Sequence, residues 1–294
     1  MAGNLRNFSA PDAPGVLELS RHALARPSEQ VGNPLWETSA EMESELSGWD
    51  RPAGDTLFVE EENGAIAGFG GVEFGAAWEH ADLFGPLVSP DFRGRKIGSR
   101  LLETSIEAGR ASGAKRILGS VGTRNMRGRM HLERAGFRAL DGVQEVYRLL
   151  PRSLRPLEQG PDGVTVRRGG PEDLEAALAL YRECFPGGRF PESIWRDALE
   201  RGTVYLAEFG GSAIAFVDID PSDRWAYHVG DTEPERDRGI ATYLLSCALE
   251  NYWRRHPGES LGLSVSAANL PAIRLYRRLG FMPWLVLQPF ELVL

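Results

Sequence analysis

The sequence predicts an α/β protein of two tandem domains, each a twisted mixed sheet with helices on both faces. Two observations lead to this expectation. The chain has 294 residues, 42% of them hydrophobic, which is enough for two cores of ordinary size. One order of parts occurs twice: a strand, a turn containing Gly and Arg, an apolar-striped helix, a further strand and an Asn. The chain is therefore interpreted as an internal duplication.

The domain boundaries follow from composition. Residues 151–162 are rich in Pro, Gly and charged residues, which is typical of a linker. We therefore expect an N-terminal domain over residues 1–150 and a C-terminal domain over residues 163–294.

In the first half, Asn63-Gly64 between two apolar runs predicts a hairpin, because both residues tolerate the positive φ of a tight turn. Apolar residues then recur at helical spacing from Lys96 until glycines end the pattern. The expected strands are residues 5–8, 56–60, 65–69, a strand ending near 88, and 117–121; the expected helices are residues 12–25, 39–46 and 96–109.

The second half repeats this order. A helix beginning near Arg238 presents an apolar stripe and stops at Pro257-Gly258, and Pro271 suits the first turn of a later helix. The expected strands are residues 164–168, 204–208, 213–219, 225–231, 261–265 and a closing strand 281–294; the expected helices are residues 172–184, 238–256 and 271–279.

Composition excludes several classes of function. No apolar run is long enough to cross a bilayer and the first residues lack the apolar core of a signal peptide, so we expect a soluble, cytoplasmic protein without a membrane partner. Cys184 and Cys247 lie far apart without metal-ligand spacing, so we expect buried thiols and no metal. The net charge is −8 and no basic arm is present, so we expect no nucleic-acid partner.

The most informative motif is Arg236-Asp-Arg-Gly239-Ile-Ala241, which opens the apolar-striped helix of the second half. The unpaired amides and the dipole of a helix N-terminus attract anions, and small residues let phosphate oxygens approach the main chain. The first half has the corresponding run from Val88 to Ser99. In each half an Asn lies eleven positions before the Gly of a Gly-Phe pair, at Asn125 and Asn269.

This order of motifs resembles the GNAT superfamily of acyl-CoA-dependent N-acetyltransferases, and the resemblance covers both halves. It implies that acetyl-CoA is the co-substrate and that a primary amine of a small molecule or peptide accepts the acetyl group by direct attack. The tandem arrangement is similar in architecture to mycothiol synthases, which acetylate a cysteinyl amine, but this similarity does not fix the acceptor. Oligomeric state stays open.

The resemblance also implies which residues bind the coenzyme. In the second copy the strand residues before the turn supply a backbone amide to the carbonyl oxygen, the turn binds pyrophosphate and Asn269 contacts the coenzyme. These residues are Val229, Gly230, Asp231, Arg236, Asp237, Arg238, Gly239, Ile240, Ala241, Thr242 and Asn269. Their first-copy counterparts are Val88, Arg93, Gly94, Arg95, Gly98 and Ser99.

Tyr276 occupies the place of the family's general acid, seven residues after Asn269, where its phenol would protonate the departing thiolate. By itself, a Tyr in this position would rather be a core aromatic. His228 is the first choice of general base because it precedes the turn and titrates near neutrality, although a lone strand His is more often structural. Asp231 and Asp220 are the alternatives.

The first copy departs from the family pattern at the acid. Leu132 stands where Tyr276 stands in the second copy and cannot donate a proton. His131 is adjacent, but one residue along a helix rotates a side chain by roughly a quarter turn, so we expect a surface residue. Lys96 also replaces the first Gly of the motif. We therefore expect a degenerate N-terminal domain.

The second copy has departures of its own. Glu233 replaces a Pro of the pattern, and Asp237 brings a carboxylate to the phosphate turn. These changes leave a second hypothesis, a non-catalytic acyl-CoA-binding or sensor protein, and a third and weaker one, in which the first copy is the active copy.

Overall fold

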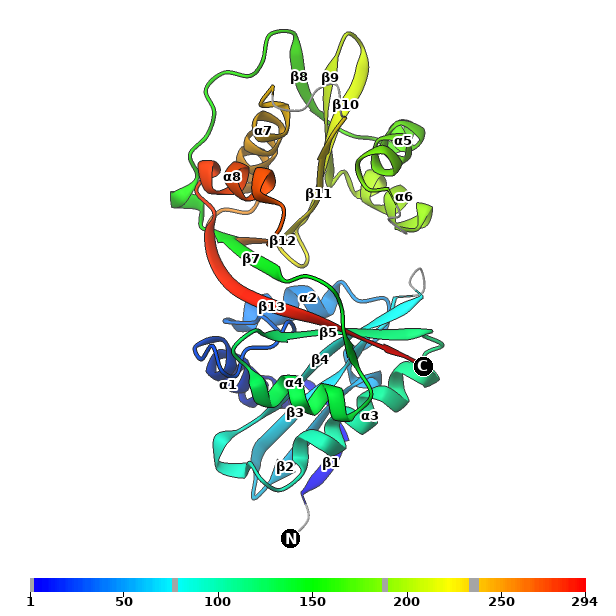
Figure 1. Ribbon diagram of the computed structural model, residues 1–294, viewed down its shortest axis with the longest axis vertical. Helices are drawn as coiled ribbons and strands as arrows, with labels where there is room; N and C mark the ends of the chain where they lie inside the picture. Colours follow the sequence, from blue (N-terminus) through cyan, green and yellow to red (C-terminus); the bar gives the residue numbers. More distant parts are fainter. Residues whose placement is uncertain (1–2, 76–78, 187–189, 233–237) are drawn as a thin grey trace. The chain divides into compact units, whose positions relative to one another are not determined.

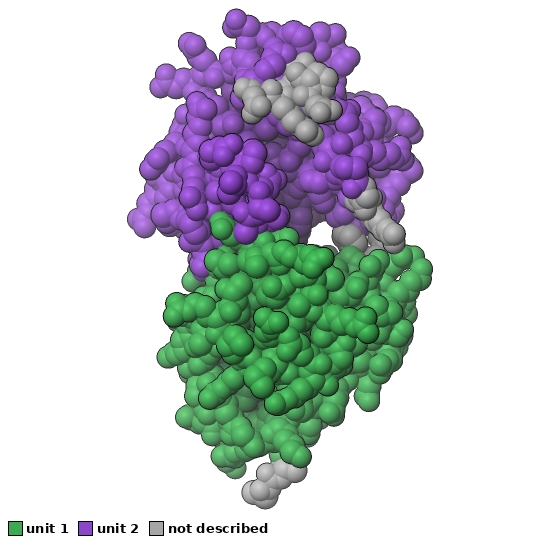
Figure 2. Space-filling model, in the orientation of Figure 1, with its two compact units in different colours: residues 1–145, 285–294 green, residues 146–284 purple. Residues whose placement is uncertain are grey.

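The computed structural model describes residues 3–75, 79–186, 190–232 and 238–294 (Figure 1). It divides into two compact units, coloured separately in Figure 2. Unit 1 comprises Met1–Glu145 and Leu285–Leu294, and unit 2 comprises Val146–Trp284. Across the described residues, no helix combines the length and apolar character that a bilayer crossing requires.

Unit 1 contains a mixed sheet in the order β1-β2-β3-β4-β5-β13, with β6 beside β13. β4 and β5 are parallel, whereas β13 is antiparallel to β5. The strands are β1 (Asn4–Asn7), β2 (Leu57–Glu62), β3 (Ala65–Glu73), β4 (His80–Val88), β5 (Arg116–Gly122), β6 (Arg138–Ala139) and β13 (Met282–Val293); the helices are α1 (Ala13–Leu24), α2 (Ser39–Ser47), α3 (Ile97–Ala111) and α4 (Met126–Arg134).

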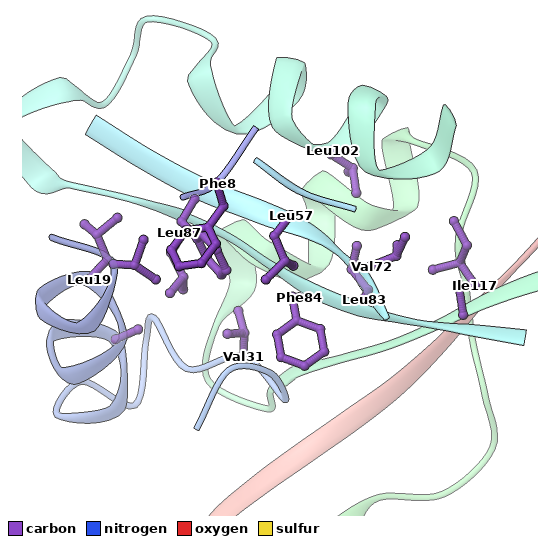
Figure 3. Close-up of a cluster of buried hydrophobic side chains, with 14 of the residues drawn as sticks. Phe8, Leu19, Val31, Leu57, Val72, Leu83, Phe84, Leu87, Leu102 and Ile117 are labelled. Carbon is purple, nitrogen blue, oxygen red and sulfur yellow. The ribbon is translucent and has the colours of Figure 1, made fainter. Parts of the chain in front are cut away.

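Helices cover both faces of this sheet. Successive side chains of β3 point to opposite faces, and apolar contacts are made on each face. A Cβ at Gly68 would meet Ile97 and Leu101 of α3, whereas Phe69 contacts Phe8 and Trp36 on the other face. Figure 3 shows the main core cluster of the unit, in which Val31 is buried with the strand residues. The predicted hairpin is confirmed, and both turn residues take positive φ.

Unit 2 contains a second mixed sheet in the order β7-β12-β11-β10-β9-β8. The strands are β7 (Gln144–Leu149), β8 (Val164–Arg168), β9 (Val204–Phe209), β10 (Ser212–Asp220), β11 (Trp225–Asp231) and β12 (Leu261–Ser266); the helices are α5 (Leu174–Cys184), α6 (Glu192–Arg201), α7 (Ile240–Arg255) and α8 (Leu270–Leu279).

Two cores lie on the two faces of this second sheet. Leu206 and Phe216 pack with α5 and α6, whereas Tyr205 and Ala215, which alternate with them along β9 and β10, pack with α7 and α8. The predicted α/β class, with helices on both faces of a mixed sheet, is confirmed.

The two units differ from the domains predicted from the sequence in two places, at the segment 151–162 and at the closing strand. The segment 151–162, interpreted as a linker, belongs to unit 2, where the Leu157 amide donates to Ser246 at 2.9 Å and the Arg155 amide donates to the Leu279 carbonyl at 3.0 Å. The closing strand forms as predicted, but its residues from Leu285 onward belong to unit 1. The physical reason is burial: Phe290 packs into the unit 1 core, and Tyr147 of β7 packs into the unit 2 core.

This exchange makes the stability of unit 1 depend on the last residues of the chain. Phe290→Ala should lower the free energy of unfolding of unit 1 by about 3–5 kcal/mol, because it removes a fully buried ring from a close-packed core. Val293→Ala is the matched control on the same strand; its side chain is exposed, so its effect should stay within about 0.5 kcal/mol. Denaturant unfolding measures both, and equal effects would contradict the assignment of β13 to the unit 1 core.

Candidate functional site

A β-bulge interrupts the strand before the turn in each unit. In unit 1 the register between β3 and β4 shifts so that Gly70 faces both Gly85 and Pro86. In unit 2 the register between β10 and β11 shifts so that Val217 faces both His228 and Val229. The first bulge residue has positive φ in both units, +73° at Gly85 and +49° at His228. The two bulges match through the same offset of 143 residues that relates the two turns.

Beyond the bulge, the two central parallel strands of each unit separate. Registered pairing between β4 and β5 covers residues 80–82 against 116–118, and that between β11 and β12 is at Trp225 and Gly262. A bulge bends and twists its strand, which ends the regular ladder. Each unit therefore has a wedge between its central strands, next to the turn.

The turn of unit 1 presents its main-chain amides. Within the described structure, the backbone N–H groups from Gly94 to Gly98 find no acceptor, and Lys96 takes the left-handed conformation, with φ +62°, just before α3. Gly239 takes the same conformation, φ +80°, before α7. Orphan amides at a helix N-terminus form an anion site, so this backbone fits the pyrophosphate of coenzyme A.

A cavity of about 900 Å³ adjoins the unit 1 turn, which is within the size range of ligand pockets. Most of the predicted first-copy coenzyme residues line it: Val88, Arg93, Gly94, Gly98 and Ser99. Arg95 is not among the lining residues, because its guanidinium binds Glu62 of β2 at 2.5 Å.

The guanidinium of Arg93 is also committed within the protein. It makes two hydrogen bonds to the carboxylate of Glu29, of 2.6 and 3.2 Å. This pair holds the pKa of Glu29 below its usual value. Arg93 therefore contributes its backbone to the cavity rather than a free charge.

Residues 30–33, which we call the strap, lie in the wedge of unit 1. The Gly32 amide donates to Ser120 and the Gly122 amide donates to Gln30, at 2.8 and 2.9 Å, so the strap pairs with β5. On the other side, the Gly85 amide donates to the Asn33 carbonyl at 2.8 Å, which attaches the strap to β4. The strap therefore bridges the two separated strands.

The two cap asparagines differ in what they bind. Asn125 is buried, caps α4 by accepting from the Gly128 amide at 2.9 Å, and donates to the Gln30 carbonyl of the strap at 2.9 Å. Asn269 is exposed and caps α8 by accepting from the Ala272 amide at 3.2 Å. The described residues offer its Nδ2 group no acceptor, so in unit 2 this donor remains available to a ligand.

Part of the predicted unit 2 turn falls outside the described residues, including Arg236 and Asp237. The described remainder, from Arg238 onward, leads into α7. The guanidinium of Arg238 lies 5.1 Å from the centre of the Phe209 ring, while Ile240, Ala241 and Thr242 are buried in the first helical turn. Because the first amides of a helix have no acceptor within the helix, the backbone N–H groups of these three residues and of Gly239 can bind a ligand.

Tyr276 lies on α8 and is 7% exposed. Its ring centre is 5.8 Å from that of Phe281 and 6.5 Å from that of Tyr147. No described residue hydrogen-bonds its hydroxyl, and burial raises the pKa of this phenol to about 12. Tyr276 is thus packed as a core aromatic while keeping an uncommitted, protonated hydroxyl.

His228 lies among aromatic rings from three elements. The ring centre of Phe190 is 4.4 Å away, and those of Tyr181, Phe185 and Trp195 lie within 6 Å. Burial lowers the pKa of His228 to about 4, and its Nδ1 atom is buried without a hydrogen-bond partner. The imidazole is therefore neutral at physiological pH. Phe185, Phe190 and Trp195 belong to the core cluster on this face.

The alternative bases are placed differently. Asp220 pairs in register with Trp225, at the end of β11 away from α7, and its carboxylate accepts from Arg201 at 2.8 Å. Asp231 lies next to the turn, and its carbonyl accepts from the Cys184 thiol at 3.3 Å. A Cβ at Gly230 would lie 2.9 Å from that of Cys184, so α5 packs directly on this part of β11.

His131, expected at the surface, has a half-buried side chain. Its Nε2 atom is buried without a hydrogen-bond partner, and the residue lines the unit 1 cavity near Gly98. The neighbouring Leu132 is the residue that turns into the core. Helical spacing predicts that His131 and Leu132 point in different directions, but it does not predict which of the two lines the cavity.

No set of three His, Cys, Asp or Glu side chains within the described ranges is arranged to hold a metal ion. Neither Cys184 nor Cys247 forms a disulfide, and both are half-buried. The donors that the site offers are therefore backbone amides, hydroxyls and cationic side chains, which suit an organic polyanion.

Comparison with known proteins agrees with this geometry. The acetyltransferase (GNAT) family model matches residues 22–137 and 174–281, more than half of the chain. A mycothiol acetyltransferase of Thermobispora bispora is 29% identical over 221 residues, covering 68% of this chain and 72% of that protein. The mycothiol acetyltransferase of Rhodococcus erythropolis is 28% identical over 254 residues, covering 76% of this chain and 80% of that protein.

Solved structures show the same fold. A GCN5-related N-acetyltransferase from Sphaerobacter thermophilus has a TM-score of 0.77 at 23% identity, covering 99% of this chain and 95% of that one. A tandem GNAT protein from the clavulanic acid biosynthesis pathway has a TM-score of 0.66 at 18% identity, covering 99% and 98%. The chain belongs to the GNAT acetyltransferase family and is an N-acetyltransferase with two tandem GNAT domains.

Proposed function

We propose that the chain moves an acetyl group from acetyl-CoA to a primary amine of a small molecule or peptide, by direct attack, in unit 2. The observation that carries this assignment is the contrast between the asparagines. Asn125 is bound to the strap, which lies in the wedge of unit 1, whereas the Nδ2 group of Asn269 is available. The described part of the connection between α5 and α6 makes no backbone hydrogen bond to β12.

The bulge strand of unit 2 supplies the amide for the carbonyl oxygen. Acetyl-CoA brings an activated acetyl group as a thioester, and charge develops on its carbonyl oxygen during attack. Backbone amides in the stretch from Val229 to Asp231 would stabilise that charge. The position matching Val229 in unit 1 is Pro86, which has no N–H group to donate. This difference also favours unit 2.

Tyr276 would protonate the departing thiolate. Its raised pKa keeps the phenol protonated throughout the physiological range, so the hydroxyl always carries the proton to be donated. Leu132 in the matching place of unit 1 has no proton to give. We therefore assign the acid role to unit 2 alone.

His228 would accept the proton of the attacking amine, directly or through water. Its lowered pKa means that the imidazole is already neutral when substrate arrives, although the same shift weakens it as a base. Its positive φ in the bulge is a strained conformation for a residue with a Cβ, and such strain is often kept at functional sites. Asp231 is the alternative.

For the acceptor, the similarity to mycothiol acetyltransferases favours small amines, and we propose cysteinyl amines as the first members of an amine screen. In unit 1, Val88, Arg93, Gly94, Gly98 and Ser99 would bind the coenzyme without transferring its acetyl group. We therefore expect two coenzyme sites and one catalytic site in each chain.

Tyr276→Phe should lower kcat by about 10²–10⁴-fold, the usual contribution of a general acid, with little change in folding because the ring is kept. Release of free thiol from acetyl-CoA in the presence of the amine measures the rate. Leu132→Met is the matched control in unit 1, since this swap conserves core volume and should leave kcat unchanged. A loss in Leu132→Met equal to that in Tyr276→Phe would place the acid elsewhere.

The pH dependence tests His228. Because its pKa is lowered to about 4, kcat/KM calculated for the neutral form of the amine should stay level from neutral pH down to about pH 5 and fall only near pH 4. His228→Gln should lower the plateau by about 10²-fold, while His80→Gln, on β4 of unit 1, should not. If His228→Gln keeps wild-type kcat/KM at every pH, the base is another group.

The asparagines give a matched test of the strap. Without ligand, Asn125→Ala should destabilise unit 1 by about 2–3 kcal/mol, because it removes a cap and a buried hydrogen bond to Gln30. Asn269→Ala removes only a cap and should cost unit 2 about 1 kcal/mol. Denaturant unfolding compares the two, and a larger loss for Asn269→Ala would argue against the strap as a fixed part of unit 1.

A further inference from the structure

The strongest unassigned feature of unit 1 is a group of cations that line its cavity, Lys96 at the start of α3 and three arginines at α4. Lys96, Arg124, Arg127 and Arg134 line this cavity, and the described residues give none of them an ion-pair partner. The one carboxylate among the lining residues, Glu29, is bound to Arg93. The cavity wall therefore carries a clear excess of positive charge in a protein whose net charge is −8.

The helix α4 presents one face to this cavity. Arg127, Met130, His131 and Arg134 all line it, and their spacing of i, i+3, i+4 and i+7 places them along one side of the helix. Met130 is 46% exposed, and Met126 at the helix start, which also lines the cavity, is 57% exposed. An apolar, polarizable surface thus lies between arginines.

These cations and the amides of the turn are two separate anion sites. The turn from Gly94 to Gly98 offers main-chain N–H groups at the start of α3, whereas Arg127 and Arg134 lie on α4 and Arg124 lies two residues before it. A ligand that uses both needs two anionic groups, and a flat ring between them would fit the exposed thioethers. Coenzyme A has this arrangement in its pyrophosphate, adenine and ribose 3′-phosphate.

We infer that Arg124 and Arg127 of unit 1 bind the 3′-phosphate of the coenzyme, with Met126 and Met130 beside its adenine, so that unit 1 discriminates coenzyme A from its 3′-dephospho form. This rests on the proposed function in that unit 1 binds coenzyme at all. Guanidinium groups form strong charge-assisted hydrogen bonds with phosphate, which gives the arginines this selectivity.

Unit 2 keeps only part of this charge. Lys96, Arg124 and Arg127 correspond to Gly239, Ala268 and Pro271, whereas Arg134 corresponds to Arg278 and Met130 to Arg274. An exposed apolar residue does recur, because Leu270, 57% exposed, matches Met126. Because the cations around the start of the helix are missing in unit 2, unit 2 should discriminate less than unit 1 between coenzyme A and the dephospho form.

The test is calorimetric titration of the full chain with coenzyme A, 3′-dephospho-coenzyme A and 4′-phosphopantetheine, at low and at moderate salt. One of two binding events should weaken by about 10- to 100-fold when the 3′-phosphate is absent, and this difference should shrink as salt rises. At that event 4′-phosphopantetheine should bind no better than the dephospho form, because it lacks the adenine as well.

Variants then assign the effect. The double variant Arg124→Gln/Arg127→Gln should bind coenzyme A and the dephospho form equally at that event and leave the other event unchanged. Arg129→Gln is the matched control, because Arg129 lies on the same helix, does not line the cavity and pairs with Glu133. The control should behave as the parent chain.

Equal binding of coenzyme A and the dephospho form by the parent chain would overturn the inference, as would discrimination that survives in the double variant. Both results would leave acetyl transfer in unit 2 untouched. Conversely, discrimination lost in the double variant of a chain that acetylates no amine would support the inference while contradicting the proposed catalytic role of unit 2.

Discussion

The bulge in the strand before the turn is the constraint on which both sites depend. Two residues of one strand oppose one residue of its neighbour, and the left-handed conformation of Gly85 or His228 makes this possible. Regular pairing with the next parallel strand then ends, and a wedge opens beside the helix N-terminus. Without this separation, a continuous ladder would use the backbone amides that the chemistry needs.

The duplication has kept this backbone and changed what lies against it. In unit 1 the strap pairs with β5, and its Asn33 carbonyl accepts a hydrogen bond from the Gly85 amide of β4. The Gln30 carbonyl of the strap also accepts a hydrogen bond from the side-chain amide of Asn125. In unit 2 the aromatic cluster around His228 approaches the bulge instead, and Asn269 keeps its donor. In unit 1 these internal hydrogen bonds occupy the amide of Asn125, whereas the described residues offer the matching amide of Asn269 no acceptor. This contrast is the basis of the proposal that only unit 2 is catalytic.

Much of the fold could be predicted from the sequence, because the local signals were strong. Asn63-Gly64 predicted a turn with positive φ, and the apolar stripe after Lys96 predicted α3; both are confirmed. The exchange of closing strands could not be predicted, since β7 and β13 carry similar apolar patterns and only long-range packing decides which core receives them. The composition of the segment 151–162 is typical of a linker. Composition carries no information on the hydrogen bonds that hold this segment on unit 2, so its place in that unit could not be predicted.

The candidate site was predictable in its backbone and less so in its side chains. The repeated motif located the turn before α3, yet it could not show that Arg93 and Arg95 are bound to Glu29 and Glu62, because these partners lie far away in sequence. Likewise, the ordinary pKa of a histidine favours His228 as a base, whereas the rings of Tyr181, Phe190 and Trp195 surround it and its burial lowers that pKa. The strap gave no sequence signal, since its bonds are made by the main chain.

The most direct test of the account is a single-turnover measurement. The chain is loaded with acetyl-CoA that carries a labelled acetyl group until both sites are filled, and is then mixed rapidly with an acceptor amine from the screen. One acetyl group per chain should transfer at once, while the second remains bound as the intact thioester until it exchanges. Rapid transfer of both acetyl groups would contradict the distinction between a catalytic unit 2 and a binding unit 1.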